Sequence, residues 1–175
     1  MKENKLFRYP LILGIVAVVA GLLLAIVYNV TSPIIEKNAN KRENAVILEV
    51  FGEDAKIENI SDTLNEAETG YGVNNAYEVK SEGKTYYVYK LTIKDGVGSD
   101  DSAAIVALQN GKIYTLKFTS TGDSYANLYN SASYLNKIKG KTGLTDSDVV
   151  TGASDTGDNV IGAINAAIAH YGRVK

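Results

Sequence analysis

A long uninterrupted apolar segment near the N-terminus stands out in the pattern of hydrophobic and polar residues. Residues Leu11–Val27 carry no charged or hydrogen-bonding side chain. With the flanking Tyr9 and Tyr28 the segment reaches about twenty residues, enough for a helix to cross a bilayer core. Tyrosines are typical of the two ends of such a helix, where the membrane meets water. No small-x-small cleavage site follows, so the pattern predicts an uncleaved membrane anchor over residues 10–30.

A second apolar pattern, with helical spacing, follows the anchor. Ser32 suits a helix N-cap, Pro33 suits the first helical position, and Gly52 suits a helix stop. Between them lie the apolar residues Ile34, Ile35, Ala45, Val46, Leu48, Val50 and Phe51. The pattern therefore predicts a membrane-proximal helix over residues 31–52.

Between residues 76 and 121 the pattern changes to the alternation of apolar and polar residues that is typical of strands. The runs Tyr77–Lys80 and Tyr86–Ile93 show it. Ala103–Leu108 is a short, wholly apolar run, as expected of a central strand, and Ile113–Phe118 is the expected returning strand. Gly83 and the pair Asn110-Gly111 separate two pairs of runs, and Asn-Gly is a strong signal for a two-residue hairpin. We therefore expect an antiparallel meander of about four strands. The polar residues 52–75 before it predict a loop with room for one short strand or helical turn.

Two further helices are predicted after these strands. Asp123 or Ser124 suits the N-cap of the first, which closes at Gly140. Its apolar residues recur at helical spacing: Tyr125, Leu128, Tyr129, Ala132, Leu135 and Ile138. The second occupies Gly157–Tyr171. The expected fold class is α+β: one N-terminal transmembrane helix, a membrane-proximal helix, then a small antiparallel sheet packed with helices.

Charge gives the expected topology. Lys2, Lys5 and Arg8 precede the apolar segment, and no basic residue follows it until Lys37. The positive-inside rule then places the N-terminus in the cytoplasm and the C-terminal bulk outside, as a single-pass protein of the inner or cytoplasmic cell membrane. The expected order is a cytoplasmic tail over 1–9, the transmembrane anchor over 10–30, the membrane-proximal helix over 31–52 and an extracytoplasmic domain over 53–175.

Composition argues against several classes of function. Three of the 18 basic residues and one of the 20 acidic residues lie in residues 1–30, so the rest carries a net charge of −4. Such a domain does not suit nucleic-acid binding. With no cysteine and one histidine, His170, the sequence offers no catalytic triad and no cluster of transition-metal ligands. We expect His170 to interact with the dipole at the C-terminus of the last helix.

A turn rich in small and hydroxyl residues leads into that last helix. Its sequence is Asp148-Val-Val-Thr151-Gly152-Ala153-Ser154-Asp155-Thr156. At such a turn, backbone N–H groups and the positive end of the helix dipole lie beside hydroxyl groups, which suits a bound phosphate. Serine, threonine and aspartate before a helix also form ordinary N-caps, so the turn alone leaves both interpretations open.

The turn resembles the flavinylation motif of the FMN-binding domain family, Asp-x-x-Ser/Thr-Gly-Ala-Ser/Thr-x-Ser/Thr, at every fixed position. In that family the second hydroxyl residue carries FMN through a phosphoester bond, and the corresponding residue here is Ser154. The resemblance therefore implies covalent FMN. The other residues of the motif are Asp148, Thr151, Gly152, Ala153 and Thr156.

The hydroxyls of the motif are expected to have different roles. We expect the helix to start at Gly157 or Asp158 with Thr156 or Asp155 as its cap, which leaves Ser154 free to point outward. Thr151 is expected to hydrogen-bond within the turn. Asp148 is a candidate to assist flavin transfer, by binding the metal of the transferase or by activating the hydroxyl.

Contacts with the flavin ring are less well defined. By themselves Gly96 and Gly98 are better explained by a long hairpin loop, whereas the resemblance places them in a loop that borders the ring. The family's Glu-Thr-Pro-Gly-Leu-Gly signature, which lies along the flavin, is replaced here by Ser120–Tyr125. Tyr125 or Tyr129 could stack on the ring, and the alternative is that both pack in the core or at its rim.

Over residues 10–171 the order of elements is most similar to the RnfG proteins of the Rnf ion-translocating electron transport complex, and it is related to the NqrC proteins of the Na⁺-translocating NADH:quinone reductase. The resemblance implies an electron carrier in a ferredoxin:NAD⁺ oxidoreductase that couples electron transfer to Na⁺ or H⁺ translocation. It implies three kinds of partner: other membrane subunits of the complex, the lipid bilayer, and a flavin transferase that uses FAD. Two alternatives stay open, a stand-alone flavinylated protein of extracellular electron transfer and a flavin-free extracytoplasmic binding or scaffold domain.

Overall fold

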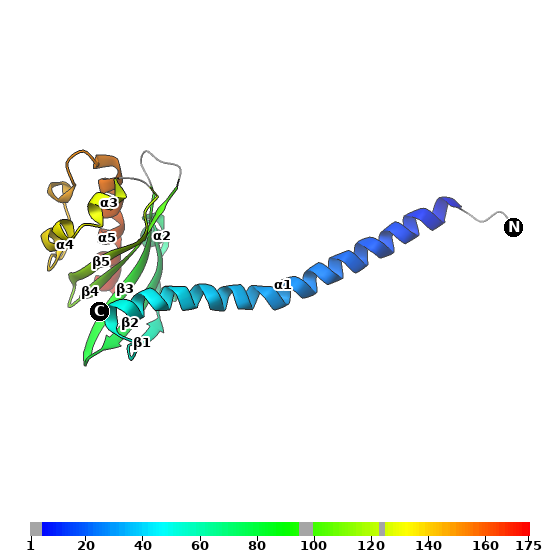
Figure 1. The fold of residues 1–175 in the computed structure, drawn as a ribbon, viewed down its shortest axis with the longest axis horizontal. Coiled ribbons are helices and arrows are strands. Elements are labelled where there is room, and N and C mark those ends of the chain that lie inside the picture. The colour runs from blue at the N-terminus through cyan, green and yellow to red at the C-terminus, as the bar shows by residue number, and fades with distance from the viewer. Residues whose placement is uncertain (1–4, 95–99, 123–124) are drawn as a thin grey trace. The chain divides into compact units, whose positions relative to one another are not determined.

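The computed structural model forms two compact units, Met1–Ala45 and Val46–Lys175 (Figure 1). It describes residues 5–94, 100–122 and 125–175, and within the first helix it describes side chains at residues 9–28, 31–32 and 44–51. The candidate ring contacts Gly96 and Gly98 and the predicted caps Asp123 and Ser124 lie outside the described residues.

The first helix, α1, runs without interruption over Lys5–Phe51. The predicted break at Ser32 and Pro33, with a separate membrane-proximal helix after it, is therefore wrong. A proline inside a helix removes one backbone hydrogen bond, at a cost of about 3 kcal/mol. The helix nevertheless continues through Pro33, with helical residues on both sides. Ser32 consequently lies inside α1, where a serine has no N-cap role.

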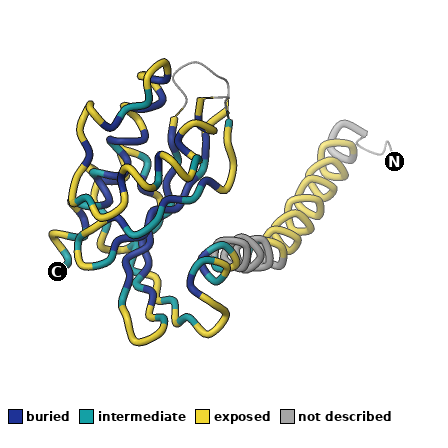
Figure 2. Tube along the Cα trace, turned by 60° about the vertical axis from the view of Figure 1, so that its left-hand side comes forward, coloured by how far each residue is buried: buried dark blue, intermediate teal, exposed yellow. Residues whose placement is uncertain are grey.

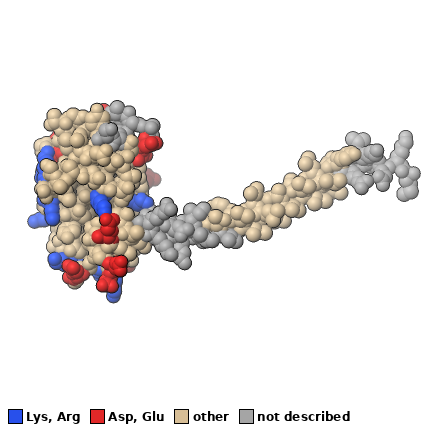
Figure 3. Space-filling view, in the orientation of Figure 1, with Lys and Arg blue, Asp and Glu red and all other residues tan. Residues whose placement is uncertain are grey.

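The apolar part of α1 satisfies the length and composition of a membrane span. Tyr9–Tyr28 comprises 20 residues with a mean hydropathy of 2.9, and none of its most apolar stretch is buried in the structure. Figure 3 shows no Lys, Arg, Asp or Glu side chain on the visible face of this described stretch. The helix can therefore cross a bilayer once.

The described residues of the second unit contain a five-stranded antiparallel sheet in the order β1-β2-β3-β4-β5. The strands are β1 (Lys56–Asn59), β2 (Val73–Ser81), β3 (Lys84–Ile93), β4 (Ser102–Gln109) and β5 (Lys112–Ser120). The expected α+β class is confirmed. Both predicted hairpin turns are present, because Glu82-Gly83 and Asn110-Gly111 have positive φ at both residues, as a type I′ turn requires.

The segment 52–72, which precedes β2, is more ordered than the expected loop. It contains the strand β1, the short 3₁₀ helix η1 (Ser61–Thr63) and α2 (Glu66–Gly70). Asn65 caps α2, since its side chain accepts hydrogen bonds from the N–H groups of Ala67 and Glu68, and the Glu68 carboxylate accepts from the N–H of Asn65 in return. This capping box stabilises a helix of only five residues.

The first of the two helices predicted after the sheet is divided into α3 (Ala126–Tyr129) and α4 (Ala132–Ile138). Ser131 causes the division. Its hydroxyl accepts a hydrogen bond from the N–H of Tyr134 and donates one to the carbonyl of Leu128, which caps α4 and competes with a continuous helix. The 3₁₀ helix η2 (Asp146–Asp148) and the long α5 (Ser154–Val174) follow.

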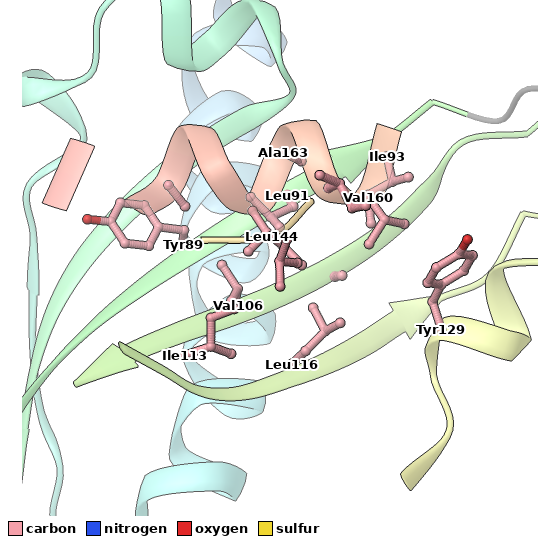
Figure 4. Packing of buried hydrophobic residues seen from close by; sticks show 14 of the residues in the cluster. Tyr89, Leu91, Ile93, Val106, Ile113, Leu116, Tyr129, Leu144, Val160 and Ala163 are labelled. Atoms are coloured by element: carbon pink, nitrogen blue, oxygen red, sulfur yellow. The ribbon is translucent and has the colours of Figure 1, made fainter. Parts of the chain in front are cut away.

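The two faces of the sheet carry two hydrophobic clusters. Alternate residues of β3, such as Tyr89 and Leu91, pack beneath α5 with Val160 and Ala163 (Figure 4). The other face of the same strand contacts the end of α1 through a smaller cluster that contains Ile47, Phe51, Tyr77, Val79, Tyr86, Val88, Ile105 and Ala107. In Figure 2 the buried residues concentrate in the strands and the loops are mostly exposed. The end of α1 therefore belongs to the core of the second unit, which begins before residue 53.

Candidate functional site

Helix α5 begins at Ser154, three residues before the first of the two expected starts. Ala153 is the N-cap residue, and the N–H of Gly157 already donates to the Ala153 carbonyl at 2.9 Å. Asp155 and Thr156 consequently lie inside the first turn, and the prediction that one of them caps the helix is wrong. The turn before the helix depends on Gly152, whose φ of +86° is a conformation that glycine adopts without strain.

The three hydroxyl residues of the motif have different environments. Ser154 and Thr151 are exposed, whereas Thr156 is buried with 2% of its surface accessible. Ser154 is thus an accessible hydroxyl at the first position of a 21-residue helix. The burial of Thr156 makes it a poor acceptor of a large group.

An open pocket of about 320 Å³ surrounds Ser154. Among the described residues its lining consists of Tyr125 and the five consecutive residues from Gly152 to Thr156. Tyr125 is 40% exposed, so of the two places in the alternative interpretation, the core or its rim, it does not occupy the core. The structure therefore brings together two candidates that are 29 positions apart in the sequence, Ser154 and Tyr125.

Tyr129, the other candidate for ring stacking, is part of the core. It is 1% exposed, and its ring contacts Tyr134 at a centroid distance of 4.8 Å. Its hydroxyl accepts a hydrogen bond from the N–H of Val150 at 3.0 Å and donates one to the carbonyl of Ala153 at 2.8 Å. Burial raises the pKa of this hydroxyl, so it stays protonated and able to donate. The sequence pattern predicts that Tyr129 is an apolar residue of a helix, but it does not predict the contact of its hydroxyl with the motif.

Asp148 is buried beside the turn and does not line the pocket. Its carboxylate forms an ion pair with Lys141 and accepts a hydrogen bond from the N–H of Thr145 at 3.1 Å. Burial alone would raise the pKa of Asp148, but the hydrogen bonds and charge of its partners outweigh burial, and the pKa is lowered. The ionised carboxylate thus holds η2, from which the motif turn departs.

The electrostatics of the helix start have opposing components. Within the described part of the chain no side chain caps α5, so the N–H groups of its first turn and its dipole favour an anion there. Asp155 and Asp158 are exposed close to the same end and oppose a second negative charge. The arrangement suits a singly charged diester better than a free phosphate dianion.

His170 is fully buried rather than placed at an open helix end. Its Nδ1 lies 3.0 Å from the Tyr89 hydroxyl and its Nε2 lies 2.8 Å from the Thr63 hydroxyl. Among the described residues there is no group of three or more His, Cys, Asp or Glu that could hold a metal ion.

Comparison with known proteins gives two matches to protein families. A family described as the RnfG N-terminal region matches residues 1–50, and a family described as PsbP matches residues 51–133. No curated protein and no solved structure matches the chain. The first match includes the apolar helix and indicates, with it, a single-pass membrane protein. Neither description names a flavin, and neither match reaches the motif at residues 148–156.

Proposed function

We propose that this chain is a membrane-anchored electron carrier that holds FMN covalently at Ser154, and that it serves as the RnfG component of an Rnf-type complex. The observation that carries the proposal is the position of Ser154: an exposed hydroxyl at the start of a long helix, inside a pocket walled by Tyr125. The match of residues 1–50 to the RnfG N-terminal region supports the membrane anchor and the Rnf component of the proposal.

The residues at the pocket fit an attached FMN. The Ser154 oxygen would carry the phosphoester, the N–H groups of the first turn of α5 would face the phosphate, and Tyr125 offers an exposed aromatic wall. A volume of about 320 Å³ lies at the lower end of the range for ligand pockets. When bound, FMN supplies one- and two-electron transfer, and the protein supplies its position and environment.

In the attachment step this chain supplies the Ser154 hydroxyl. The bond from Ser154 Oγ to the FMN phosphorus forms as the pyrophosphate bond of FAD breaks, AMP leaves, and a base of the transferase takes the hydroxyl proton. An ester that retains the flavin is an advantage in a domain outside the cytoplasm, because no cytosolic flavin pool could replace a lost cofactor there. The proposed partners are the other membrane subunits of the complex, the transferase and the bilayer.

The first test replaces the proposed acceptor. Ser154→Ala should abolish covalent flavin in cells that contain the transferase, whereas Ser154→Thr should retain it. Thr151→Ala is a matched control, because Thr151 is an exposed hydroxyl in the same turn, and it should retain the flavin as well. Mass spectrometry of the peptide that contains residues 142–173 measures the gain of one FMN less one water.

Fluorescence of the band in a denaturing gel distinguishes the alternatives. A wild-type chain without a fluorescent band would favour the flavin-free binding or scaffold domain. If Ser154→Ala keeps its flavin, the acceptor is another hydroxyl, and Thr151 becomes the leading candidate because Thr156 is buried. Purification together with other membrane proteins of the complex separates an Rnf component from a stand-alone flavoprotein of extracellular electron transfer.

A further inference from the structure

We propose that Tyr129 is a positioning residue, whose hydroxyl fixes the turn that presents Ser154 for flavin transfer. This inference rests on the proposed function of Ser154. It assigns to a buried core tyrosine the task of holding the acceptor hydroxyl in one place and in one orientation.

The two hydrogen bonds of the Tyr129 hydroxyl span the whole turn. The hydroxyl accepts from the N–H of Val150 at one end and donates to the carbonyl of Ala153 at the other. The same Ala153 carbonyl accepts from the N–H of Gly157 in the first turn of α5. One oxygen atom thereby connects the entry to the turn with the start of the helix, and Ser154 follows directly.

Gly157 shows that α5 is packed closely against this hydroxyl. A Cβ atom at residue 157 would lie 2.3 Å from the Tyr129 hydroxyl oxygen and 2.8 Å from Val149 Cγ1. Both distances are too short for real carbon contacts, so the helix start can approach Tyr129 only with glycine at this place. The hydrogen bonds of the Tyr129 hydroxyl and the position of the first turn of α5 therefore depend on each other.

Tyr129 also links the two walls of the pocket. It ends the short helix α3, and Tyr125 is the N-cap residue of that helix. Asn130, the next residue, accepts a hydrogen bond from the N–H of Phe118 and so ties the end of α3 to β5. The hydroxyl of Tyr129 then connects α3, which carries Tyr125, with the turn that carries Ser154.

Tyr134 provides a matched control within the same aromatic pair. It is 3% exposed, and its ring packs edge-on against that of Tyr129 at 82°. Among the described residues its hydroxyl has no hydrogen-bond partner. Like Tyr129→Phe, Tyr134→Phe removes one tyrosine hydroxyl from this aromatic pair, but it breaks no hydrogen bond to the turn.

The experiment compares Tyr129→Phe and Tyr134→Phe in the full chain in detergent, with purified flavin transferase and FAD. Tyr129→Phe should slow incorporation about ten-fold or more, because misplacement of a reacting atom by about 1 Å can cost about a hundred-fold in rate. It should also spread FMN to Thr151, which peptide mass spectrometry detects. Tyr134→Phe should incorporate FMN within about two-fold of the wild-type rate, all of it at Ser154. Circular dichroism establishes the temperature at which both variants are folded.

A second measurement does not depend on the transferase. Hydrogen–deuterium exchange of the peptide that contains Val150 should become faster in Tyr129→Phe and stay unchanged in Tyr134→Phe. Tyr129→Phe that incorporates FMN at the wild-type rate, only at Ser154, would overturn the inference, as would unchanged exchange at Val150. A wild-type chain that takes up no FMN overturns the proposed function itself, which is a different result from selective failure of one variant.

Discussion

At the scale of single residues, His170 has a defined hydrogen-bonding state. The Thr63 hydroxyl donates to the Ile60 carbonyl at 2.6 Å, so towards His170 it acts as an acceptor. Nε2 of the imidazole therefore carries the hydrogen, and Nδ1 accepts from the Tyr89 hydroxyl. A second proton on Nδ1 would remove this acceptor and place a charge in the core. Arg173 and the ionised Glu68 lie close enough to influence the ring electrostatically.

This arrangement predicts a loss of stability in mild acid. Burial, with a contribution from the charge of Arg173, lowers the pKa of His170 below its usual 6.5. Between that lowered pKa and 6.5 the imidazole binds a proton in the unfolded chain but not in the folded chain. The contribution of neutral His170 to folding stability is therefore complete above pH 6.5 and declines as the pH falls below it. The free energy of unfolding should decrease by at most about 1.4 kcal/mol per pH unit, the limit for one proton. Urea denaturation at pH 8 to 5 measures it.

The carboxylates do not obscure this window. The pKa values of Glu68 and Asp148 are lowered from their ordinary values, so their stabilising contributions are lost only below about pH 4.5. His170→Gln is the control, and it should lack the decline between pH 6.5 and 5. A wild-type chain with constant stability across that range would show that the imidazole does not titrate as described.

Individual residues differ in how far the sequence alone could identify them. The resemblance of the turn to a flavinylation motif pointed to Ser154; the residue is exposed, and its role as the FMN acceptor stays a prediction. The contacts of Tyr129 with the turn arise from chain segments that meet only after folding, so no local pattern signals them. The contact of Asp148 with Thr145 is local, and the spacing Thr-x-x-Asp of a capping box does signal it. Tyr129 occupies an apolar position of a helical pattern, and such positions ordinarily indicate a core residue and nothing more.

At the scale of elements, the strands followed their apolar and polar patterns, whereas the helix starts predicted at Ser32 and after Asp155 or Thr156 were wrong. The start of α5 illustrates the reason. Asp155 and Thr156 are good caps by type, but hydrogen bonds from Tyr129 and Gly157 to the Ala153 carbonyl place the helix start earlier. Similarly, β1 has Ile57 as its single apolar residue and forms because its backbone pairs with β2. Pairing of this kind is non-local and leaves a weak trace in the sequence.

The last turns of α1 should contribute strongly to the stability of the domain. Ile47 is 1% exposed on the sheet face opposite α5, and Phe51 contacts Tyr86 at a centroid distance of 4.6 Å. Ile47→Ala should lower the free energy of unfolding by about 2–5 kcal/mol, the usual cost of such a cavity. Glu49→Ala is the control on the same helix. It removes an exposed ion pair with Lys117, worth about 0–1 kcal/mol.

Chemical denaturation of both variants in detergent measures the difference. An equal and small effect of the two substitutions would mean that the helix end is dispensable and that the domain does begin near residue 53, as the sequence suggested. A large effect of Ile47→Ala alone requires that any soluble fragment of the domain include Val46–Phe51. Fragments that begin at Asn44 and at Glu53 should then differ in solubility, since the second exposes an apolar face of the sheet.

At the scale of the whole molecule, an apolar helix and an α+β domain were predictable because both rest on long patterns. The family matches cover residues 1–133 in two parts, whereas the candidate site combines Tyr125 with the later residues Gly152–Thr156. The proposed function therefore draws on two independent sources, the N-terminal similarity for the membrane context and the pocket at Ser154 for the cofactor. If the chain is not part of an Rnf-type complex, the proposed flavin site at Ser154 can still be correct, and the converse also holds.

The orientation in the membrane is the property on which the proposed role of the molecule depends. Lys2, Lys5 and Arg8 precede the span, and the sequence places no basic residue after it until Lys37. The positive-inside rule therefore predicts a cytoplasmic N-terminus and residues 46–175 outside. Protease added to intact spheroplasts should digest this domain, while a cytoplasmic marker protein stays intact until the cells are lysed. Replacing Lys2, Lys5 and Arg8 with glutamine should protect part of the domain, because the charge bias that orients the helix is lost. A wild-type domain protected until lysis would place the site in the cytoplasm, where retention of flavin by an ester would no longer have the advantage argued above.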